Sequence, residues 1–184
     1  MSFLNDLRAQ RQKFLDGLDA NEGDINLDIF EDFYPDQAHF IFELLQNAED
    51  ATASNVLFEL RPEACIVEHD GKRQFEERDV RAITGIHNST KTRSADEIGK
   101  FGIGFKSVFV YSITPIVYSA QFSFKIARLV LPEVVASLPN IGIRTRFEFP
   151  FNNPKKTPQV AFGEIRSGLE QLAETTLLFL SHLA

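Results

Sequence analysis

The most informative stretch of this chain is Glu43-Leu44-Leu45-Gln46-Asn47-Ala48-Glu49-Asp50-Ala51. Its polar residues Glu43, Asn47 and Asp50 are spaced i, i+4 and i+7, so on an α-helix they fall within about 60° of one another. Apolar residues cover most of the remaining helix surface: Phe40, Ile41, Leu44, Leu45 and Ala48. The pattern predicts a largely buried helix over 36–52 that carries one narrow polar stripe.

The residue types in this stripe suit a particular chemistry. A carboxylate at Glu43 can orient a water as a general base. The side-chain oxygen of Asn47 is a neutral ligand for Mg²⁺, an ion that keeps several of its waters and also takes phosphate oxygens. The alternative is a solvated stripe on an ordinary amphipathic helix. The spacing alone favours that alternative, so other motifs must decide between the two.

A second motif is Gly99-Lys100-Phe101-Gly102-Ile103-Gly104-Phe105-Lys106-Ser107, a glycine-rich turn that leads into a predicted helix over 105–111. Backbone N–H groups at such a turn can face an anion, and glycine permits its close approach. The spacing differs from the Gly-x-Gly-x-x-Gly dinucleotide motif, and Phe105 interrupts the P-loop pattern. Two interpretations remain open: a phosphate-binding turn, or a flexible turn whose glycines serve packing.

Two more segments are candidates for parts of a site. His69-Asp70-Gly71 follows a predicted strand, and a carboxylate there could accept a hydrogen bond from the amino group of adenine. Asp-Gly is also a common turn pair, so turn formation alone is the competing explanation. The polar segment 87–98 has no apolar period, and we predict a mobile loop that could act as a lid.

Composition limits the class of protein. With 184 residues, of which 43% are hydrophobic and 24% charged, the chain suits one globular domain with a real core. The net charge of −7 argues against general nucleic-acid binding, which needs clustered Lys and Arg. A modest basic cluster from Lys91 to Lys106 suits a small anionic ligand better. The single cysteine, Cys65, excludes a disulfide within the chain.

The sequence also carries expectations about location. The N-terminal residues lack the basic and apolar regions of a signal peptide. No stretch approaches the roughly 18 apolar residues that a membrane-spanning helix needs. We therefore expect an intracellular, cytoplasmic protein that makes no membrane contact.

Hydrophobic periodicity predicts an α+β fold in which helices cover one face of a mixed, mostly antiparallel sheet, a two-layer sandwich. The order of elements is not the regular alternation of a doubly wound sheet. The predicted helices are 2–18, 36–52, 76–83, 105–111 and 160–183, and the predicted strands are 55–60, 64–68, 116–119, 122–131 and 144–149.

The order of these motifs resembles the ATP-binding domain of the gyrase, heat-shock-90 chaperone, histidine kinase and mismatch-repair superfamily, abbreviated GHKL. Glu43-x-x-x-Asn47-Ala48-x-Asp50-Ala51 resembles its N box, and the stretch 98–109 resembles its second glycine motif. The segment 83–90 resembles the start of the family's lid. Within the superfamily, the residues 34–40 and 69–80 are similar to the sacsin-like and plant vein-patterning-like branch.

The resemblance implies a Bergerat fold, with residues 1–184 forming a single ATP-binding domain that is the excised N-terminal part of a longer protein. It also implies Mg²⁺-dependent ATP binding, with ATP and ADP as ligands, and slow ATP hydrolysis in the full-length protein. In the family, nucleotide often drives dimerisation of neighbouring domains. ATP would then act as a conformational switch in a chaperone-like or multidomain ATPase.

The resemblance assigns roles to individual residues. Glu43 is the catalytic residue that positions the attacking water, and Asn47 is the metal ligand. His69 stands where the family has the aspartate that reads adenine, and Asp70 is displaced from that position by one. The implied nucleotide-binding positions are Asn47, Asp50, His69, Asp70, Gly71, Gly99, Gly102, Ile103, Gly104, Phe105, Lys106 and Thr145.

Three other functions compete with this one. Because the Asp-x-Gly-x-Gly motif of the family is incomplete here, the domain could bind nucleotide without turnover. A protein-interaction module without a ligand is a second possibility. A P-loop-like phosphotransfer enzyme is a third, against which Phe105 argues.

Overall fold

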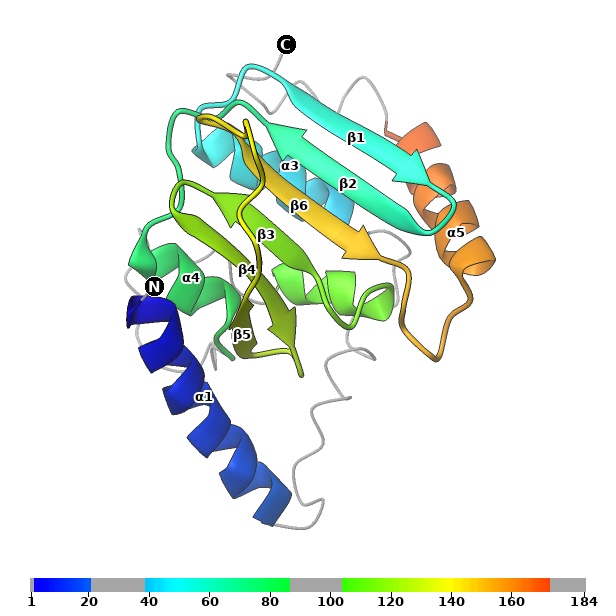
Figure 1. Ribbon diagram of the computed structural model, residues 1–184. Helices are drawn as coiled ribbons and strands as arrows, with labels where there is room; N and C mark the ends of the chain where they lie inside the picture. Colours follow the sequence, from blue (N-terminus) through cyan, green and yellow to red (C-terminus); the bar gives the residue numbers. More distant parts are fainter. Residues whose placement is uncertain (1, 21–38, 87–103, 173–184) are drawn as a thin grey trace, which may run out of the picture.

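A six-stranded antiparallel sheet forms one layer of the computed structural model, which describes residues 2–20, 39–86 and 104–172 (Figure 1). Among these residues the strand order is β1-β2-β6-β3-β4-β5, and every neighbouring pair is antiparallel. The last strand in sequence therefore lies in the middle of the sheet. The strands are β1 Val56–Arg61, β2 Ala64–His69, β3 Ile116–Ser119, β4 Phe122–Ala127, β5 Leu131–Val134 and β6 Thr145–Pro150.

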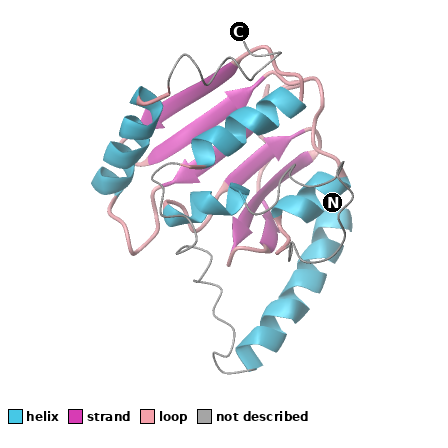
Figure 2. Cartoon of the chain, turned by 180° about the vertical axis from the view of Figure 1, so that it is seen from behind, coloured by secondary structure: helices cyan, strands magenta, loops and turns pink. Residues whose placement is uncertain are grey.

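The helices form the second layer, and the view from behind shows α3 and α4 in front of the sheet (Figure 2). α3 contacts the short 3₁₀ helix η1, α5 contacts β1 and β2, and α1 contacts the edge strand β5. The bounds are α1 Ser2–Ala20, α3 Phe40–Asp50, α4 Glu77–Ile83, η1 Gly104–Val110 and α5 Pro158–Glu170. This arrangement is the α+β sandwich that the sequence predicts.

The core lies between the two layers because the strands alternate in burial. In β6, Phe147 and Phe149 are each 1% exposed, while Arg146 and Glu148, which alternate with them, are only partly buried. The two phenylalanine rings stack with centroids 6.2 Å apart, and Phe105 of η1 packs on both of them. A period of two therefore sets which face of the sheet meets the helices.

The opposite face of the sheet is charged. Glu68 of β2 forms ion pairs with Arg144 (2.8 Å) and Arg146 (3.6 Å), and Arg146 also contacts Glu148 (2.8 Å). An antiparallel sheet can leave one face to solvent, and this face has the composition that such exposure requires. The helices and the buried polar residues of interest lie on the other face.

The structure differs from the predicted elements in a few places. The predicted strand 122–131 is divided into β4 and β5 by a turn in which Arg128 and Leu129 have φ values of 47° and 66°. The sheet is antiparallel throughout the described strands, not mixed. The helix predicted over 160–183 ends at Glu170, and its last predicted turns lie outside the described residues. The candidate lid, 87–98, also lies outside them.

Candidate functional site

Helix α3 carries the polar stripe that the sequence predicts. Its buried side includes Phe40, Ile41 and Leu44, each at most 2% exposed. Asn47 is 4% exposed, whereas Glu43 and Asp50 are only partly buried. The amide of Asn47 is therefore held within the layer between helix and sheet, and the two carboxylates of the stripe lie nearer its edge.

The carboxyl group of Glu43 packs directly against the backbone of Gly104, the first residue of η1. A Cβ atom on Gly104 would overlap this carboxyl group, with Oε1 only 2.5 Å away. Glycine is therefore required here so that the carboxylate can lie against the chain. The same carboxyl group is also near His39, whose Nε2 lies 3.5 Å from Oε1 of Glu43, one helical turn away. His39 is not among the site positions that the sequence predicts.

His69 is the last residue of β2 and faces the helices. It lies directly opposite Thr145 of β6, which in turn lies opposite Ser119 of β3. All three side chains are buried, with exposures of 4%, 0% and 1%. The hydroxyl groups of Ser119 and Thr145 are 2.6 Å apart, and the N–H of Phe75 donates to Ser119 Oγ (3.1 Å). The sheet thus brings a buried polar row together from three strands.

Ser119 is a member of this row that is not among the site positions predicted from the sequence. The signal for it is weak: it follows Val117 by two residues in a four-residue strand, so the two share the inner face. Its alignment with Thr145 depends on the pairing of β3 with β6, which are far apart in the sequence.

The protonation state of His69 follows from its surroundings. The backbone N–H of Gly71 donates to Nδ1 of the ring (3.1 Å), so the ring proton must be on Nε2. Burial lowers the pKa of His69 to about 4, although Asp70 and Glu68 act in the opposite direction. At neutral pH the imidazole is therefore uncharged, with Nδ1 as its acceptor and Nε2 as its donor.

Gly71 fixes this turn against the end of α3. A Cβ atom on Gly71 would lie 2.6 Å from the side chain of Ala51 and 3.0 Å from its carbonyl oxygen. That carbonyl accepts a hydrogen bond from the N–H of Arg73 (3.2 Å). The absence of a side chain at position 71 therefore lets the His69 turn pack on the C-terminal end of the helix that carries Glu43.

Asp70 has a different set of partners. Its Oδ1 accepts from the N–H groups of Ser54 (2.8 Å) and Asn55 (2.9 Å), and its Oδ2 accepts from the side chain of Asn55 (2.8 Å). The hydrogen bonds from Asn55 are the main reason that the pKa of Asp70 falls to about 2. Both oxygens hold the loop before β1, so it is His69 that takes the inward position beside Thr145.

Lys106 and Phe105 lie in the core, not in the polar stripe. The Nζ atom of Lys106 donates to the carbonyl oxygens of Ile83 (2.8 Å) and Leu129, and the residue is 3% exposed. Burial, with a smaller effect of Arg11, lowers the pKa of Lys106 to about 7. The ring of Phe105 packs on β6. We therefore do not include either side chain in the site, which leaves only their backbone groups as possible contacts.

A substitution at Lys106 tests this structural role. Lys106→Met should reduce the free energy of unfolding by roughly 1–3 kcal/mol, because the carbonyls of Ile83 and Leu129 would lose their donor inside the core. Urea unfolding at pH 7 measures the change. Lys125→Met is the matched control: Lys125 is a surface lysine paired with Glu133 (3.0 Å), and its substitution should change stability by less than about 0.5 kcal/mol. A folded Lys106→Met variant with more than tenfold weaker Mg·ATP binding would instead return Lys106 to the phosphate site.

Other predicted positions lie outside the described residues or in different surroundings. Gly99, Gly102 and Ile103 are outside the described residues. Asp50 is at the end of α3, where its Oδ1 accepts from the side chain of Gln46 (3.4 Å). Within residues 2–20, 39–86 and 104–172, no group of three or more His, Cys, Asp or Glu side chains could hold a metal ion. A metal at this site would therefore need ligand oxygens in addition to Asn47.

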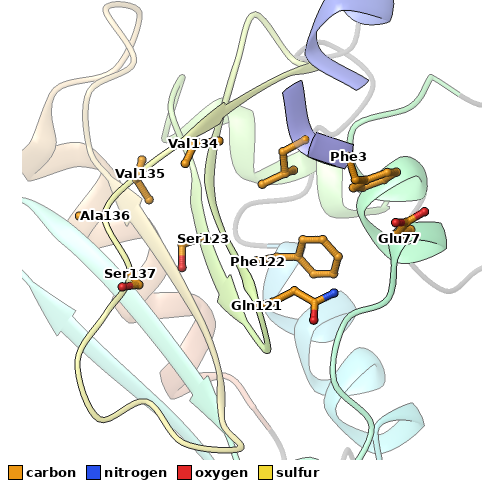
Figure 3. Close-up of a pocket in the computed structure, with 10 residues that line it drawn as sticks. Phe3, Glu77, Gln121, Phe122, Ser123, Val134, Val135, Ala136 and Ser137 are labelled. Atoms are coloured by element: carbon orange, nitrogen blue, oxygen red, sulfur yellow. The ribbon is translucent and has the colours of Figure 1, made fainter. Parts of the chain in front are cut away.

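A cavity of about 560 Å³ lies at the β4–β5 end of the sheet, between these strands and residues of α1 and α4 (Figure 3). It is lined by side chains that include Phe3, Phe122 and Val134, and it contains none of the predicted site residues. Phe122 pairs with Ser119 across β3 and β4, so the cavity lies beyond the end of the polar row. In the part of the chain that the structure describes, no helix is long and apolar enough to cross a membrane.

Parts of this chain are similar in sequence to known proteins. The NO VEIN protein of Arabidopsis thaliana is 37% identical over 99 residues, which are 52% of this chain and 4% of that protein. Sacsin of Homo sapiens is 33% identical over 107 residues, 48% of this chain and 2% of that protein. The chain thus spans only a few per cent of the length of these relatives.

The family match covers both α3 and the turn at His69. Residues 37–126 match the family described as histidine kinase-, DNA gyrase B- and HSP90-like ATPase. This match confirms the resemblance and the fold class that the sequence predicts, and it indicates a nucleotide-binding domain. Residues 37–126, about half of the chain, are therefore similar to the GHKL-type ATPases.

Proposed function

We propose that this chain binds Mg·ATP along helix α3 and that, within its full-length protein, it hydrolyses the nucleotide slowly. One observation carries the proposal: α3 has a partly buried carboxylate, Glu43, near its start and a buried amide, Asn47, one turn further on, and the buried polar residues His69 and Thr145 lie at the turn that packs against its C-terminal end. From Glu43 to Ala51 the helix rises about 12 Å. That span suits a nucleotide whose base lies by the His69 turn and whose terminal phosphates lie by Glu43.

Glu43 is the general base in this proposal. Its side chain is 32% exposed, so a water molecule can reach the carboxylate. The backbone of Gly104 and the ring of His39 both lie close to the carboxyl group and restrict where it can lie. A carboxylate held in this way can orient a water and accept its proton as the water attacks.

Asn47 is the metal-binding residue in this proposal, and the residues around it fit Mg²⁺. The described residues offer no cluster of carboxylates or imidazoles that could enclose an ion. Mg²⁺ commonly takes only one or two protein oxygens and completes its shell with water and substrate phosphates. When bound, the ion would neutralise charge on the phosphates. The contribution of the chain is one buried amide oxygen, oriented by the packing of α3.

Asn47→Ala tests both the site and its metal dependence. The variant should bind Mg·ATP at least tenfold more weakly, while binding of ATP without Mg²⁺ changes little, because only the metal loses a ligand. Calorimetric titration with ATP, ADP and GTP, with and without Mg²⁺, measures both affinities. Gln46→Ala removes an exposed amide from the adjacent position of α3 and is the control. Equal Mg²⁺-dependent affinity in Asn47→Ala and the native chain would remove Asn47 from the site.

A binding module without turnover is the second candidate function. The presence of His69 in place of the family's aspartate favours it, since turnover depends on how the whole nucleotide is held. In either case the bound nucleotide could act as a switch for neighbouring domains or for a homodimer, because the relatives are far longer than this chain. Steady-state hydrolysis by the full-length protein separates the two: binding without phosphate release supports the module.

A further inference from the structure

The hydrogen-bonding polarity of His69 has a consequence for which nucleobase the site accepts. A carboxylate offers only acceptors to a ligand. The neutral ring of His69 already uses its acceptor, Nδ1, for the N–H of Gly71 (3.1 Å). What it can offer to a ligand is therefore the Nε2–H donor.

This polarity is fixed by packing, so a ligand cannot easily reverse it. Moving the proton to Nδ1 would place it against the N–H of Gly71. Gly71 cannot withdraw, because the side chain and the carbonyl of Ala51 lie against its Cα. His69 is 4% exposed and its ring is tilted against that of Phe147, with the ring centroids 6.3 Å apart, so a charged imidazolium with both nitrogens as donors is also disfavoured.

The other members of the polar row, Thr145 and Ser119, do not determine whether the row donates a hydrogen bond to a ligand or accepts one. Thr145 and Ser119 share one hydrogen bond in which either hydroxyl could be the donor. A hydroxyl group rotates to suit its ligand. Thr145 can therefore donate to a ligand or accept from it. His69 is the member of the row that can only donate.

We propose that His69 reads the nucleobase as a hydrogen-bond donor, so that the site favours a purine with a 6-oxo group over one with a 6-amino group. The inference rests on the proposed nucleotide site and deepens it by naming the class of base. An oxo group accepts from Nε2–H, whereas an amino group would place two donors face to face and leave both unpaired in a buried place. ITP and ATP are the matched probes for this difference at position 6 of the purine.

The test is the ratio of the dissociation constants of Mg·ITP and Mg·ATP, measured by calorimetry. In the native chain ITP should bind at least as tightly as ATP. His69→Asp, whose carboxylate can accept from Gly71 and from an amino group at once, should shift the ratio toward ATP by tenfold or more, about 1.4 kcal/mol. Tighter binding of ATP by the native chain, or an unchanged ratio in His69→Asp, overturns the proposal.

Two further variants separate loss of the donor from a general effect of substitution on folding. His69→Asn keeps an acceptor for the N–H of Gly71 but withdraws the donor from the position of Nε2, so any preference for ITP should disappear in a folded protein. Glu68→Gln changes the adjacent residue, which pairs with arginines on the opposite face of the sheet, and should leave the ratio unchanged. A ratio that stays the same in a folded His69→Asn variant counts against the proposal.

Mg·tripolyphosphate, which has no base, separates this inference from the function on which it rests. If tripolyphosphate and both nucleotides bind, and the nucleotides do so equally in all variants, then the donor role of His69 is wrong and the nucleotide site stands. If none of the three binds to the native chain, the nucleotide site and the inference both fail.

Discussion

Glu43→Gln should reduce ATP turnover by roughly a hundredfold or more while the dissociation constant of Mg·ATP changes little. The amide has the same shape as the carboxylate, so packing against Gly104 is kept. It cannot accept a proton from the attacking water, so only the chemical step is lost. Phosphate release by the full-length protein, together with calorimetric binding to the variant, measures the two effects separately.

Gly104→Ala should reduce ATP turnover in the same way, although it leaves Glu43 itself unchanged. The new methyl group would overlap the carboxyl group of Glu43, which is the free end of a flexible side chain and can move aside. The protein should therefore stay folded while the carboxylate leaves its position, and turnover should fall as in Glu43→Gln. Gly163→Ala in α5 is the control, because nothing lies within 4 Å of the added Cβ. Native turnover in Glu43→Gln would exclude Glu43 as the general base.

Local periodicity explains why much of the fold could be predicted. A 3.6-residue period identified α3 and its polar stripe, and the burial of Phe40, Leu44 and Asn47 agrees with that prediction. A period of two identified β6, with Phe147 and Phe149 facing the helices. These signals depend on neighbours within one element, so the sequence alone contains them.

Contacts between distant segments explain what could not be predicted. Lys106 follows a glycine-rich turn, which is where a phosphate-binding lysine is expected. Its ammonium instead reaches the carbonyls of Ile83 and Leu129, each 23 residues away in the sequence. Leu129 lies in a turn with positive φ that no glycine marks. No local pattern encodes these partners.

Whether His69 or Asp70 faces the helices also depends on the register of β2 in the sheet. Both residues lie at the end of β2, and the sequence does not say which of them faces the helices. The pairing of His69 with Thr145 decides the question, since neighbouring residues on a strand point to opposite faces. The role of either residue in binding a base stays a prediction, but the structure favours His69 on position.

Buried, neutral His69 should also make the stability of the fold depend on pH. Its pKa is about 4 in the folded protein, lowered mainly by burial, from a usual value of 6.5. Well above pH 6.5 the ring is neutral in both states and contributes nothing to the pH dependence. As the pH falls from 6.5 to 4, the unfolded chain gains a proton that the folded protein does not, so the free energy of unfolding decreases, by about 3 kcal/mol in total.

His69→Asn isolates this contribution, because asparagine does not titrate and its side-chain oxygen can still accept from the N–H of Gly71. Urea unfolding of the native chain and the variant at pH 7, 6, 5 and 4.5 gives two curves, and their difference removes the effect of every other titrating group. The native chain should lose stability faster by up to about 1.4 kcal/mol per pH unit within this window. Asp70 acts only at lower pH, between its usual pKa of 3.8 and its folded value of about 2. Parallel curves from pH 6.5 to 4.5 would mean that His69 takes up its proton in the folded protein as readily as in the unfolded chain, and a protonated Nδ1 could not accept from Gly71.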